Sequence, residues 1–421
     1  MGRRMPENFP GPIDFGLAPM EGVTDWPARI WFAQASSPAF LWTPFLRVTD
    51  SFPARELPPV WCPELFEPIG GTGRSARVIP QLMATNPSDF IRVSELILRK
   101  VDKAFVNSGF FIDLNCGCPS PVVVGGRAGS SLLEDPAGLR GFLEFALQHV
   151  GADKLSVKVR TGFHDPAEFP RIIEALKGLP LAQVSVHGRT RPQRYLGRAD
   201  LGLIDLAARN LDPVKVVGSG DICDLASADS AAATAPGVRT WIIGRGALRN
   251  PWIFEELRTG NPVSIELGTL THAIQVFALL HELHWNAPAD LVALWRDGVF
   301  HAMPPAGTDS VRWQGLLELI QSRLPGGRVN PGRRACARTK MLWNYLRSSL
   351  PVALRDGVLL RSGNVDELVG GICALWRAHL GDSCVLVHDP EWNWVYNGSG
   401  KPDTREASHG VRTPQGKNTG P

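Results

Sequence analysis

The chain has 421 residues, of which 44% are hydrophobic and 20% charged, values typical of globular proteins. Its net charge of +3 is too small to argue for a nucleic-acid partner by itself. The seven scattered cysteines do not fit a disulfide framework and favour a reducing cytoplasm. We find neither an apolar signal segment nor an apolar run of about 18 residues, so we expect a soluble protein without a membrane span.

Short apolar runs alternate with helix-like stretches between residues 12 and 258. The runs are nearly continuous in apolar residues, as in parallel strands covered by helices. Eight of them suit an α/β fold of the (β/α)8 TIM-barrel type better than a doubly wound sheet, because no GxGxxG opens the first unit. The predicted strands are 16–20, 40–48, 77–83, 111–115, 155–160, 183–187, 215–219 and 241–244.

The sequence changes character after the last predicted strand. Residues 265–382 have helical patterning and predict a smaller all-α domain, with loops at 304–310 and 325–333, where Pro, Gly and Arg are frequent. Residues 389–421 are polar and predict a disordered tail.

Two glycine-rich stretches, 217–221 and 243–247, end the seventh and eighth predicted strands. Barrels commonly bind phosphate there, because glycines let backbone N–H groups approach the phosphate oxygens. Arg245 can add a charged fork. The alternative interpretation is a pair of tight turns.

Polar side chains also follow the other predicted strands. A cation at the barrel mouth, such as Lys158, suits a flavin, because reduced flavin carries negative charge at one ring edge. His187 can donate to the same edge, and Gln81 can both donate and accept. Each residue alone could equally be a solvated charge or a satisfied interior polar group.

The most specific stretch is 113–120, which reads DLNCGCPS. No second cysteine pair or spaced histidine pair completes a metal-ligand set, so we predict no metal site. Cys116 fits a buried thiol. Cys118 begins a loop whose proline and glycines predict a mobile, closing segment.

Several motifs in order resemble the tRNA-dihydrouridine synthase family, and the segments 46–48 and 62–65 resemble its bacterial C-type branch, which favours position 16. The resemblance implies FMN as cofactor, NADPH as reductant, a D-loop uridine of tRNA as substrate and Cys118 as proton donor. A thiol suits that role, because a pKa of about 8.5 leaves it mostly protonated at neutral pH. The matching stretches are 17–23, 113–119, 156–160, 186–190, 218–222 and 243–251.

The same resemblance assigns the remaining site residues. Asn115 would hold the uracil edge, Arg47 would contact the substrate, and a set of strand-end residues would hold the flavin. Thr43-Pro44 stands where relatives commonly have Thr-Glu, which removes a carboxylate beside the pocket. The isoalloxazine set is Gln81, Lys158 and His187, lined by Pro19, Met20 and Glu21, and the phosphate set is Ser219, Gly220, Asp221, Gly244 and Arg245.

Basic residues concentrate between 310 and 362, where ten Lys or Arg face two acids, a local balance of +8 within a chain of +3. Arg334 and Arg338 are four apart on a predicted helix and should share a face. Together with Lys340 they predict a surface for tRNA phosphates that presents the elbow to the barrel, with the target base unstacked. The alternative is an ordinary solvated helix face.

Two other functions fit parts of the pattern. A flavin barrel like dihydroorotate dehydrogenase, acting on a free pyrimidine, would explain the flavin residues but not the basic helical region. A non-catalytic tRNA-binding protein would not explain Cys118 and Lys158. No stable protein partner is expected.

Overall fold

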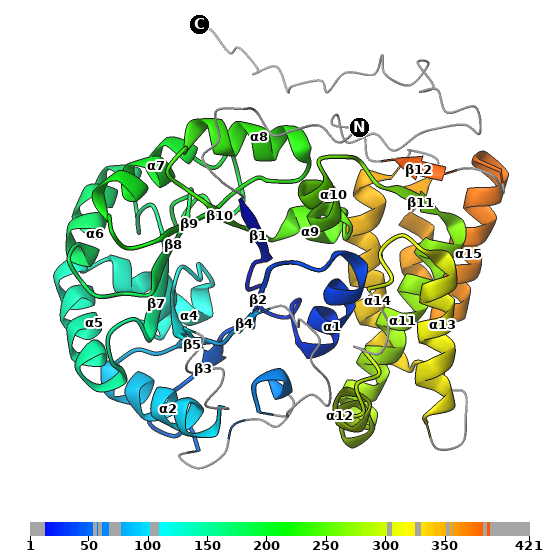
Figure 1. Ribbon diagram of the computed structural model, residues 1–421, viewed down its shortest axis with the longest axis horizontal. Coiled ribbons are helices and arrows are strands. Elements are labelled where there is room, and N and C mark those ends of the chain that lie inside the picture. Colours follow the sequence, from blue (N-terminus) through cyan, green and yellow to red (C-terminus); the bar gives the residue numbers. More distant parts are fainter. Residues whose placement is uncertain are drawn as a thin grey trace, which may run out of the picture.

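The computed structural model describes residues 13–53, 57, 61–66, 77–101, 109–300, 305–324, 330–350, 354–355, 357–381 and 385–387. The predicted tail and most of the loop 325–333 lie outside them. In Figure 1 a ring of helices surrounds the sheet, and a second group of helices packs beside it, next to α1.

The sheet is a closed parallel barrel. Its first strand β1 pairs with β10 on one side and β2 on the other, and every neighbouring pair runs parallel. The strand segments are β1 (Asp14–Leu17), β2 (Phe40–Trp42), β3 (Leu46–Arg47), β4 (Arg77–Ile79), β5 (Gln81–Met83), β6 (Ile112–Cys116), β7 (Leu155–Arg160), β8 (Gln183–His187), β9 (Val216–Ser219) and β10 (Thr240–Ile243).

Two of the eight barrel strands are interrupted, which makes ten segments. The second strand is β2 with β3, and the third is β4 with β5, separated by Pro80, which has no N–H to donate. Thr43 spans both breaks: its backbone N–H donates to Ile79 at 3.0 Å, and its hydroxyl accepts the N–H of Gln81 at 2.9 Å. All eight predicted strands are confirmed, and the barrel with them.

Capping side chains in the βα loops begin several outer helices. Asn86, Asp135, Asp200 and Asp224 each accept a backbone N–H of the first turn, which satisfies a donor that has no partner within the helix. The barrel helices are α1 (Trp26–Ser36), α2 (Pro87–Lys100), α4 (Pro121–Gly125), α5 (Pro136–Val150), α6 (Phe169–Leu176), α7 (Leu201–Asn210), α8 (Leu225–Thr234), α9 (Arg245–Arg249) and α10 (Ile253–Thr259), with 3-10 turns η1 (Pro63–Leu65), η2 (Gly129–Leu133) and η3 (Pro166–Glu168).

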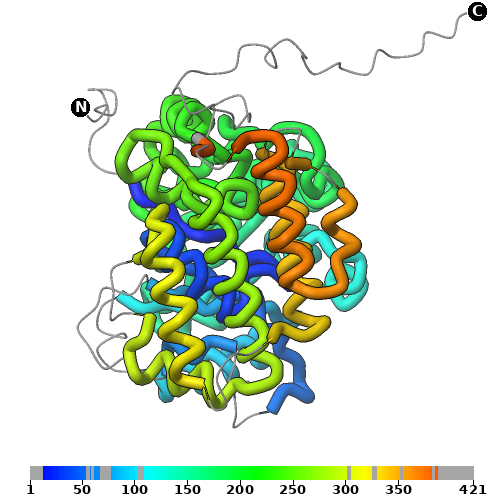
Figure 2. Tube along the Cα trace, turned by 90° about the vertical axis from the view of Figure 1, so that its right-hand side faces the viewer, coloured from blue at the N-terminus to red at the C-terminus, as the bar shows by residue number. Residues whose placement is uncertain are grey.

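The second unit is built around α11, which α13, α14 and α15 flank (Figure 2). A two-stranded antiparallel ribbon, absent from the sequence prediction, joins its two ends. The elements are β11 (Ser264–Glu266), α11 (Leu267–Asn286), α12 (Pro288–Arg296), α13 (Ser310–Ser322), α14 (Arg333–Leu346), η4 (Arg347–Ser349), η6 (Gly357–Arg361), α15 (Val365–His379) and β12 (Val385–Val387). Over the described ranges, no helix is both long and apolar enough to cross a bilayer.

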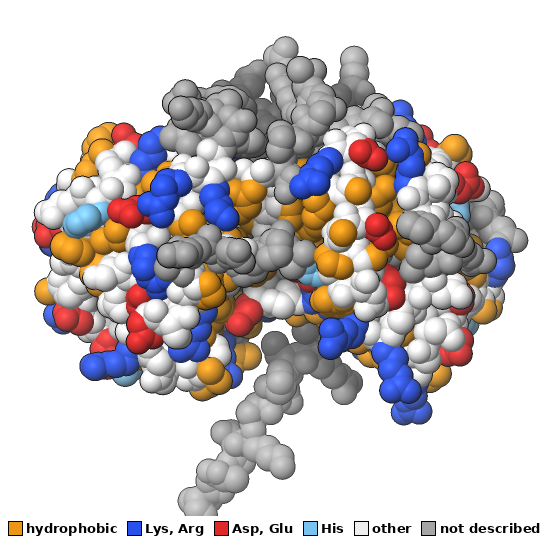
Figure 3. Space-filling view, turned by 90° about the horizontal axis from the view of Figure 1, so that it is seen from below, with side chains coloured by type: hydrophobic (Ala, Val, Ile, Leu, Met, Phe, Trp, Pro, Cys, Tyr) orange, Lys and Arg blue, Asp and Glu red, His pale blue; other side chains and the backbone are white. Residues whose placement is uncertain are grey.

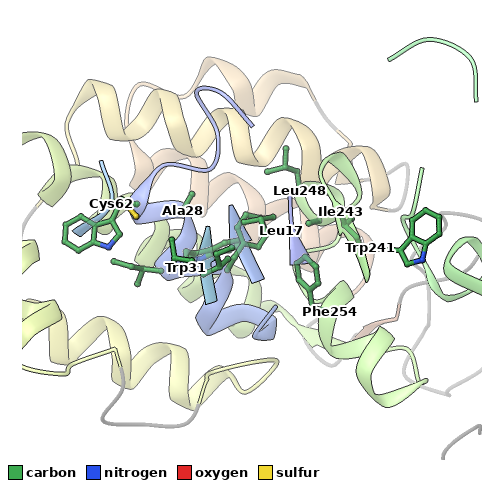
Figure 4. Close-up of a cluster of buried hydrophobic side chains, with 14 of the residues drawn as sticks. Leu17, Ala28, Trp31, Cys62, Trp241, Ile243, Leu248 and Phe254 are labelled. Atoms are coloured by element: carbon green, nitrogen blue, oxygen red, sulfur yellow. The ribbon is translucent and has the colours of Figure 1, made fainter. Parts of the chain in front are cut away.

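One apolar core runs through both units. Figure 4 shows Leu17 of β1, Trp31 of α1, Ile243 of β10 and Phe254 of α10 within it, and the same cluster continues to Phe277 of α11. The helical unit is therefore packed onto the barrel through α1, and burial of these large side chains supplies most of the contact energy.

Candidate active site

Three neighbouring strands carry the polar residues of the site. The register places Asn115 of β6 opposite Lys158 of β7, and Arg160 of β7 opposite His187 of β8. These four residues lie at the carboxyl ends of their strands, the end at which barrel enzymes carry their chemistry.

Asn115 is the centre of a hydrogen-bond network. Its side-chain oxygen accepts the backbone N–H groups of Gly117 at 3.0 Å and Cys118 at 2.9 Å, and its amide donates to Gln81 at 2.8 Å. Gln81, fully buried, donates in turn to Asp113 at 2.7 Å. One N–H of the Asn115 amide has no partner among the described residues. The network fixes the start of the Cys118 loop and leaves one donor for a ligand.

Asp113 was not singled out by the sequence. It is fully buried and accepts the hydroxyl of Ser156 at 2.5 Å, while burial raises its pKa to about 6. The signal that could have found it is the two-residue period of a strand, which directs Asp113 and Asn115 to the same side of the sheet.

Cys118 is half-buried on the loop after β6, and Cys116 is completely buried, as predicted. The hydroxyl of Ser130 donates to the carbonyl of Cys118 at 2.8 Å and ties the loop to η2. Burial raises the pKa of the Cys118 thiol, and the carboxylate of Glu21 adds to the shift. The thiol is therefore protonated at neutral pH and can act as an acid.

Lys158 and Arg160 bring positive charge to the site, and His187 lies beside them. No hydrogen-bond acceptor for Lys158 lies in the described part of the chain, and burial, followed by the charge of Arg160, lowers its pKa to about 8. Burial and the charge of Lys158 also hold the pKa of His187 well below its usual value, so its ring is neutral. A half-buried cation that has no acceptor in the protein can bind an electron-rich ligand.

Two buried guanidinium groups, Arg160 and Arg189, complete this side of the site and were missed by the sequence. Arg160 donates to the carbonyl of Gly117 at 2.7 Å and to that of Thr190 at 2.9 Å. Arg189 forms an ion pair with Asp221 at 2.6 Å. Arg160 follows Lys158 by two residues on the same strand, and this spacing was a usable signal.

The predicted phosphate end has a backbone that only glycine fits. A Cβ at Gly246 would come within 2.1 Å of the Ile222 carbonyl oxygen, and Gly220 has a φ of +157°. The guanidinium of Arg245 lies 4.6 Å from the ring centre of Tyr195 and 3.6 Å from Asp221. The Asp221 carboxylate binds Arg189 and, as an anionic acceptor, has no donor for a phosphate, so only the backbone N–H of Asp221 could bind one.

The first βα loop lies beside these turns. The sulfur of Met20 is 3.3 Å from the position that a Cβ at Gly244 would take, while Pro19 is half-buried and Glu21 exposed. Arg47 is exposed at the end of β3, where its guanidinium lies against Gly126 of the Cys118 loop. Within the described residues, no group of three potential ligands among His, Cys, Asp and Glu could hold a metal ion.

The predicted tRNA residues do not form a single face. Arg334 is exposed, but Arg338 is turned toward the barrel and bonds the β1–α1 loop, and Lys340 donates to the Ser362 carbonyl at 3.1 Å. Arg334 and Arg338 are one turn apart on α14, as predicted, but the half-buried carboxylate of Asp25 binds the Arg338 guanidinium, so that Arg334 is the more open of the two to solvent. On the side seen in Figure 3, basic and acidic side chains are interspersed.

Comparison with known proteins identifies the family of this chain. The family model described as "Dihydrouridine synthase (Dus)" matches residues 16–282. The tRNA-dihydrouridine(16) synthase of Salmonella typhimurium is 30% identical over 251 residues, which cover 58% of this chain and 76% of that protein. A tRNA-dihydrouridine(47) synthase [NAD(P)(+)]-like protein of Arabidopsis thaliana is 31% identical over 211 residues, 49% of this chain. The match spans only 29% of the Arabidopsis protein.

Solved structures add little to this result. An old yellow enzyme from Trypanosoma cruzi aligns with 59% of this chain and 89% of its own, at a TM-score of 0.40 and 9% identity. A likeness at that level carries no argument. The family assignment depends on the match over residues 16–282, which includes every strand-end residue described above. This chain belongs to the dihydrouridine synthase family.

Proposed function

We propose that this chain reduces the C5=C6 bond of a uridine in tRNA, with FMN as its flavin and NADPH as the reductant. The observation that carries the proposal is the position of Asn115, which accepts the backbone N–H of Cys118 at 2.9 Å and lies opposite Lys158 in the sheet register, so that the thiol loop begins beside the lysine. An acid beside a cation that lacks an acceptor suits the delivery of a proton next to an electron-rich cofactor.

The residues present fit a flavin. Lys158 offers a cation and His187 a neutral ring at adjacent strand ends, with the buried Gln81 amide nearby. Pro19, Met20 and Glu21 would line the ring system. At the phosphate end the donors would be the backbones of Ser219, Gly220, Asp221 and Gly244 with the side chain of Arg245, in a turn with no room for a Cβ at Gly246.

The chemistry requires one hydride and one proton across the uracil double bond. When bound, the reduced flavin supplies the hydride to C6. Cys118 donates the proton to C5, since burial keeps its thiol protonated, and solvent then restores the proton. Asn115 holds the Cys118 loop through two backbone N–H groups and offers its remaining amide N–H to the uracil edge. Arg47, whose guanidinium lies against Gly126 of that loop, would contact the substrate.

Position 16 of the D-loop is the preferred target. The bacterial relatives named for position 16 are matched over 73% to 76% of their length, whereas the Arabidopsis relative named for position 47 is matched over 29%. For the tRNA surface we propose the exposed side chains of Arg333, Arg334 and Arg361.

The decisive experiment starts from the purified protein. We expect its absorbance spectrum to show a bound flavin, and we expect the protein with NADPH and unmodified tRNA to form dihydrouridine, mapped by mass spectrometry. The Cys118→Ala variant should keep the flavin and lose the product. Protein that takes up no FMN contradicts the proposal, and so does reduction of free uridine without reduction of tRNA.

A further inference from the structure

The loop between β1 and α1 is a tight turn that carries three of the proposed flavin-lining residues. The hydroxyl of Thr24 accepts the N–H of Met20 at 2.9 Å, and the carbonyl of Met20 accepts the N–H of Val23 at 3.0 Å. Gly22 has a φ of +66°, which favours glycine. The position of Met20 therefore depends on the conformation of residues 22 to 24.

Arg338 of α14 binds this loop, although it lies 313 residues from Asp25 in the sequence. Its guanidinium donates to the carbonyl oxygens of Gly22 and Val23, the latter at 3.1 Å, and to the carboxylate of Asp25 at 2.7 Å. Only 14% of the Arg338 side chain is exposed. One side chain of the helical unit thus holds three acceptors just beyond Pro19, Met20 and Glu21.

A second helix supports the same carboxylate. His281 of α11 lies 3.1 Å from Asp25 through Nε2, and its Nδ1 lies 2.8 Å from the carbonyl oxygen of Phe277. Both ring nitrogens have an oxygen partner, and these two contacts fix the orientation of the ring. Asp25 also caps α1, accepting the N–H of Ala28 at 3.4 Å. The carboxylate is therefore fixed between the barrel and two helices.

Among the described residues, the other hydrogen bonds between the two units do not reach the loop. Trp31 donates to the Ala273 carbonyl at 2.7 Å, and Gln34 donates to the Phe300 carbonyl at 2.7 Å, both from the body of α1. These bonds attach the helical unit to a barrel helix. Arg338 differs because it bonds the turn that holds Met20 beside Gly244.

We propose that Arg338, with Asp25, is a positioning residue through which the helical unit sets the conformation of the β1–α1 loop and thereby the affinity of the barrel for its flavin. This inference rests on the proposed function, because it requires that the barrel bind a flavin. It assigns the helical unit a role in the cofactor site in addition to any role in binding RNA.

The test compares FMN binding by the full-length apo-proteins. We expect Arg338→Met to raise the FMN dissociation constant by about tenfold or more, since hydrogen bonds to charged groups are among the strong ones. Arg338→Lys keeps the charge but reaches fewer acceptors, so it should restore part of the affinity. Gln34→Met, which removes a bond of the same kind away from the loop, is the matched control.

FMN binding is measured at a temperature at which circular dichroism shows that each variant is folded. If Arg338→Met does not fold, the comparison of Arg338→Lys with the wild type tests the inference. The inference is overturned if the wild type, the Arg338 variant and Gln34→Met bind FMN with equal affinity. It is also overturned if the Arg338 variant and Gln34→Met lose FMN affinity to the same extent. Loss of tRNA binding with unchanged FMN affinity would assign Arg338 to RNA and also overturn it. Failure of the wild type to bind FMN is a separate result, which contradicts the proposed function itself.

Discussion

The side chain of Asn115 and the backbone of Cys118 are joined by a 2.9 Å hydrogen bond, so the penultimate residue of strand β6 fixes Cys118 in the loop that follows the strand. A proton donor must lie within reach of the atom it protonates, and geometry decides its efficiency before acidity does. The bond therefore connects the barrel scaffold directly to the proposed acid.

Replacing the proposed acid should stop the reaction without emptying the site. We expect Cys118→Ala to lower turnover by at least ~100-fold, because general acid catalysis contributes on that order. FMN and tRNA dissociation constants should stay near those of the wild type. Single-turnover mixing of reduced enzyme with tRNA measures the effect, with Cys373→Ala of α15 as the control thiol. A fall in both variants would count against a role specific to Cys118.

Flavin affinity should depend on pH through Lys158, whose pKa is lowered from 10.5 to about 8. Below this value the free protein carries the ammonium, and above it the amine is neutral. Affinity should therefore fall as pH rises through about 8, since the charged form is the one that attracts an electron-rich ligand. FMN titrations of the wild type and of Lys158→Met, below and above pH 8, measure this change in affinity. If the affinity of the variant falls equally with pH, Lys158 is not the source of the pH dependence.

The buried ion pair of Arg29 and Glu64 should matter far more for stability than any exposed pair. Their side chains are 0% and 4% exposed, and Arg29 also donates to the carbonyls of Thr24 and Trp61. Arg29→Met should lower the free energy of unfolding by about 3–5 kcal/mol, because it leaves a buried carboxylate uncompensated. Urea unfolding measures this.

The matched control for that prediction is Arg99→Ala, which breaks an exposed pair with Glu95 and should cost about 1 kcal/mol or less. The double variant Arg29→Met with Glu64→Leu should recover much of the loss. A small effect of Arg29→Met alone would show that the loop of Glu64 does not depend on this pair.

Salt dependence should reveal the tRNA surface. Each phosphate contact contributes about one to the slope of the logarithm of affinity against the logarithm of salt. Arg334→Gln should therefore weaken tRNA binding and reduce this slope by about one. Filter binding over a salt series measures both, and Arg99→Gln on α2 should change neither. An unchanged slope in Arg334→Gln would remove Arg334 from the surface.

The sequence predicted the barrel because its strands are local signals: each is a short apolar run followed by a polar end, as at Lys158 and His187. It missed the breaks at Thr43 and Pro80. The hydrogen bonds that stabilise the chain at these breaks join two different strands, and a local pattern does not report such bonds. It missed the ribbon of β11 and β12, since three-residue strands carry too little pattern. It did not reveal the contact between Arg338 and Asp25, which are 313 residues apart, because no local periodicity reports such a contact.

The ribbon of β11 and β12 has a consequence for how this architecture can vary. Ile265 pairs with Leu386, so the chain enters and leaves the helical segment at the same place. Residues can be added or removed between these two strands without changing the separation of the segment's ends. The helical segment can therefore change in length and sequence during evolution, to bind a different partner, while the barrel keeps its structure.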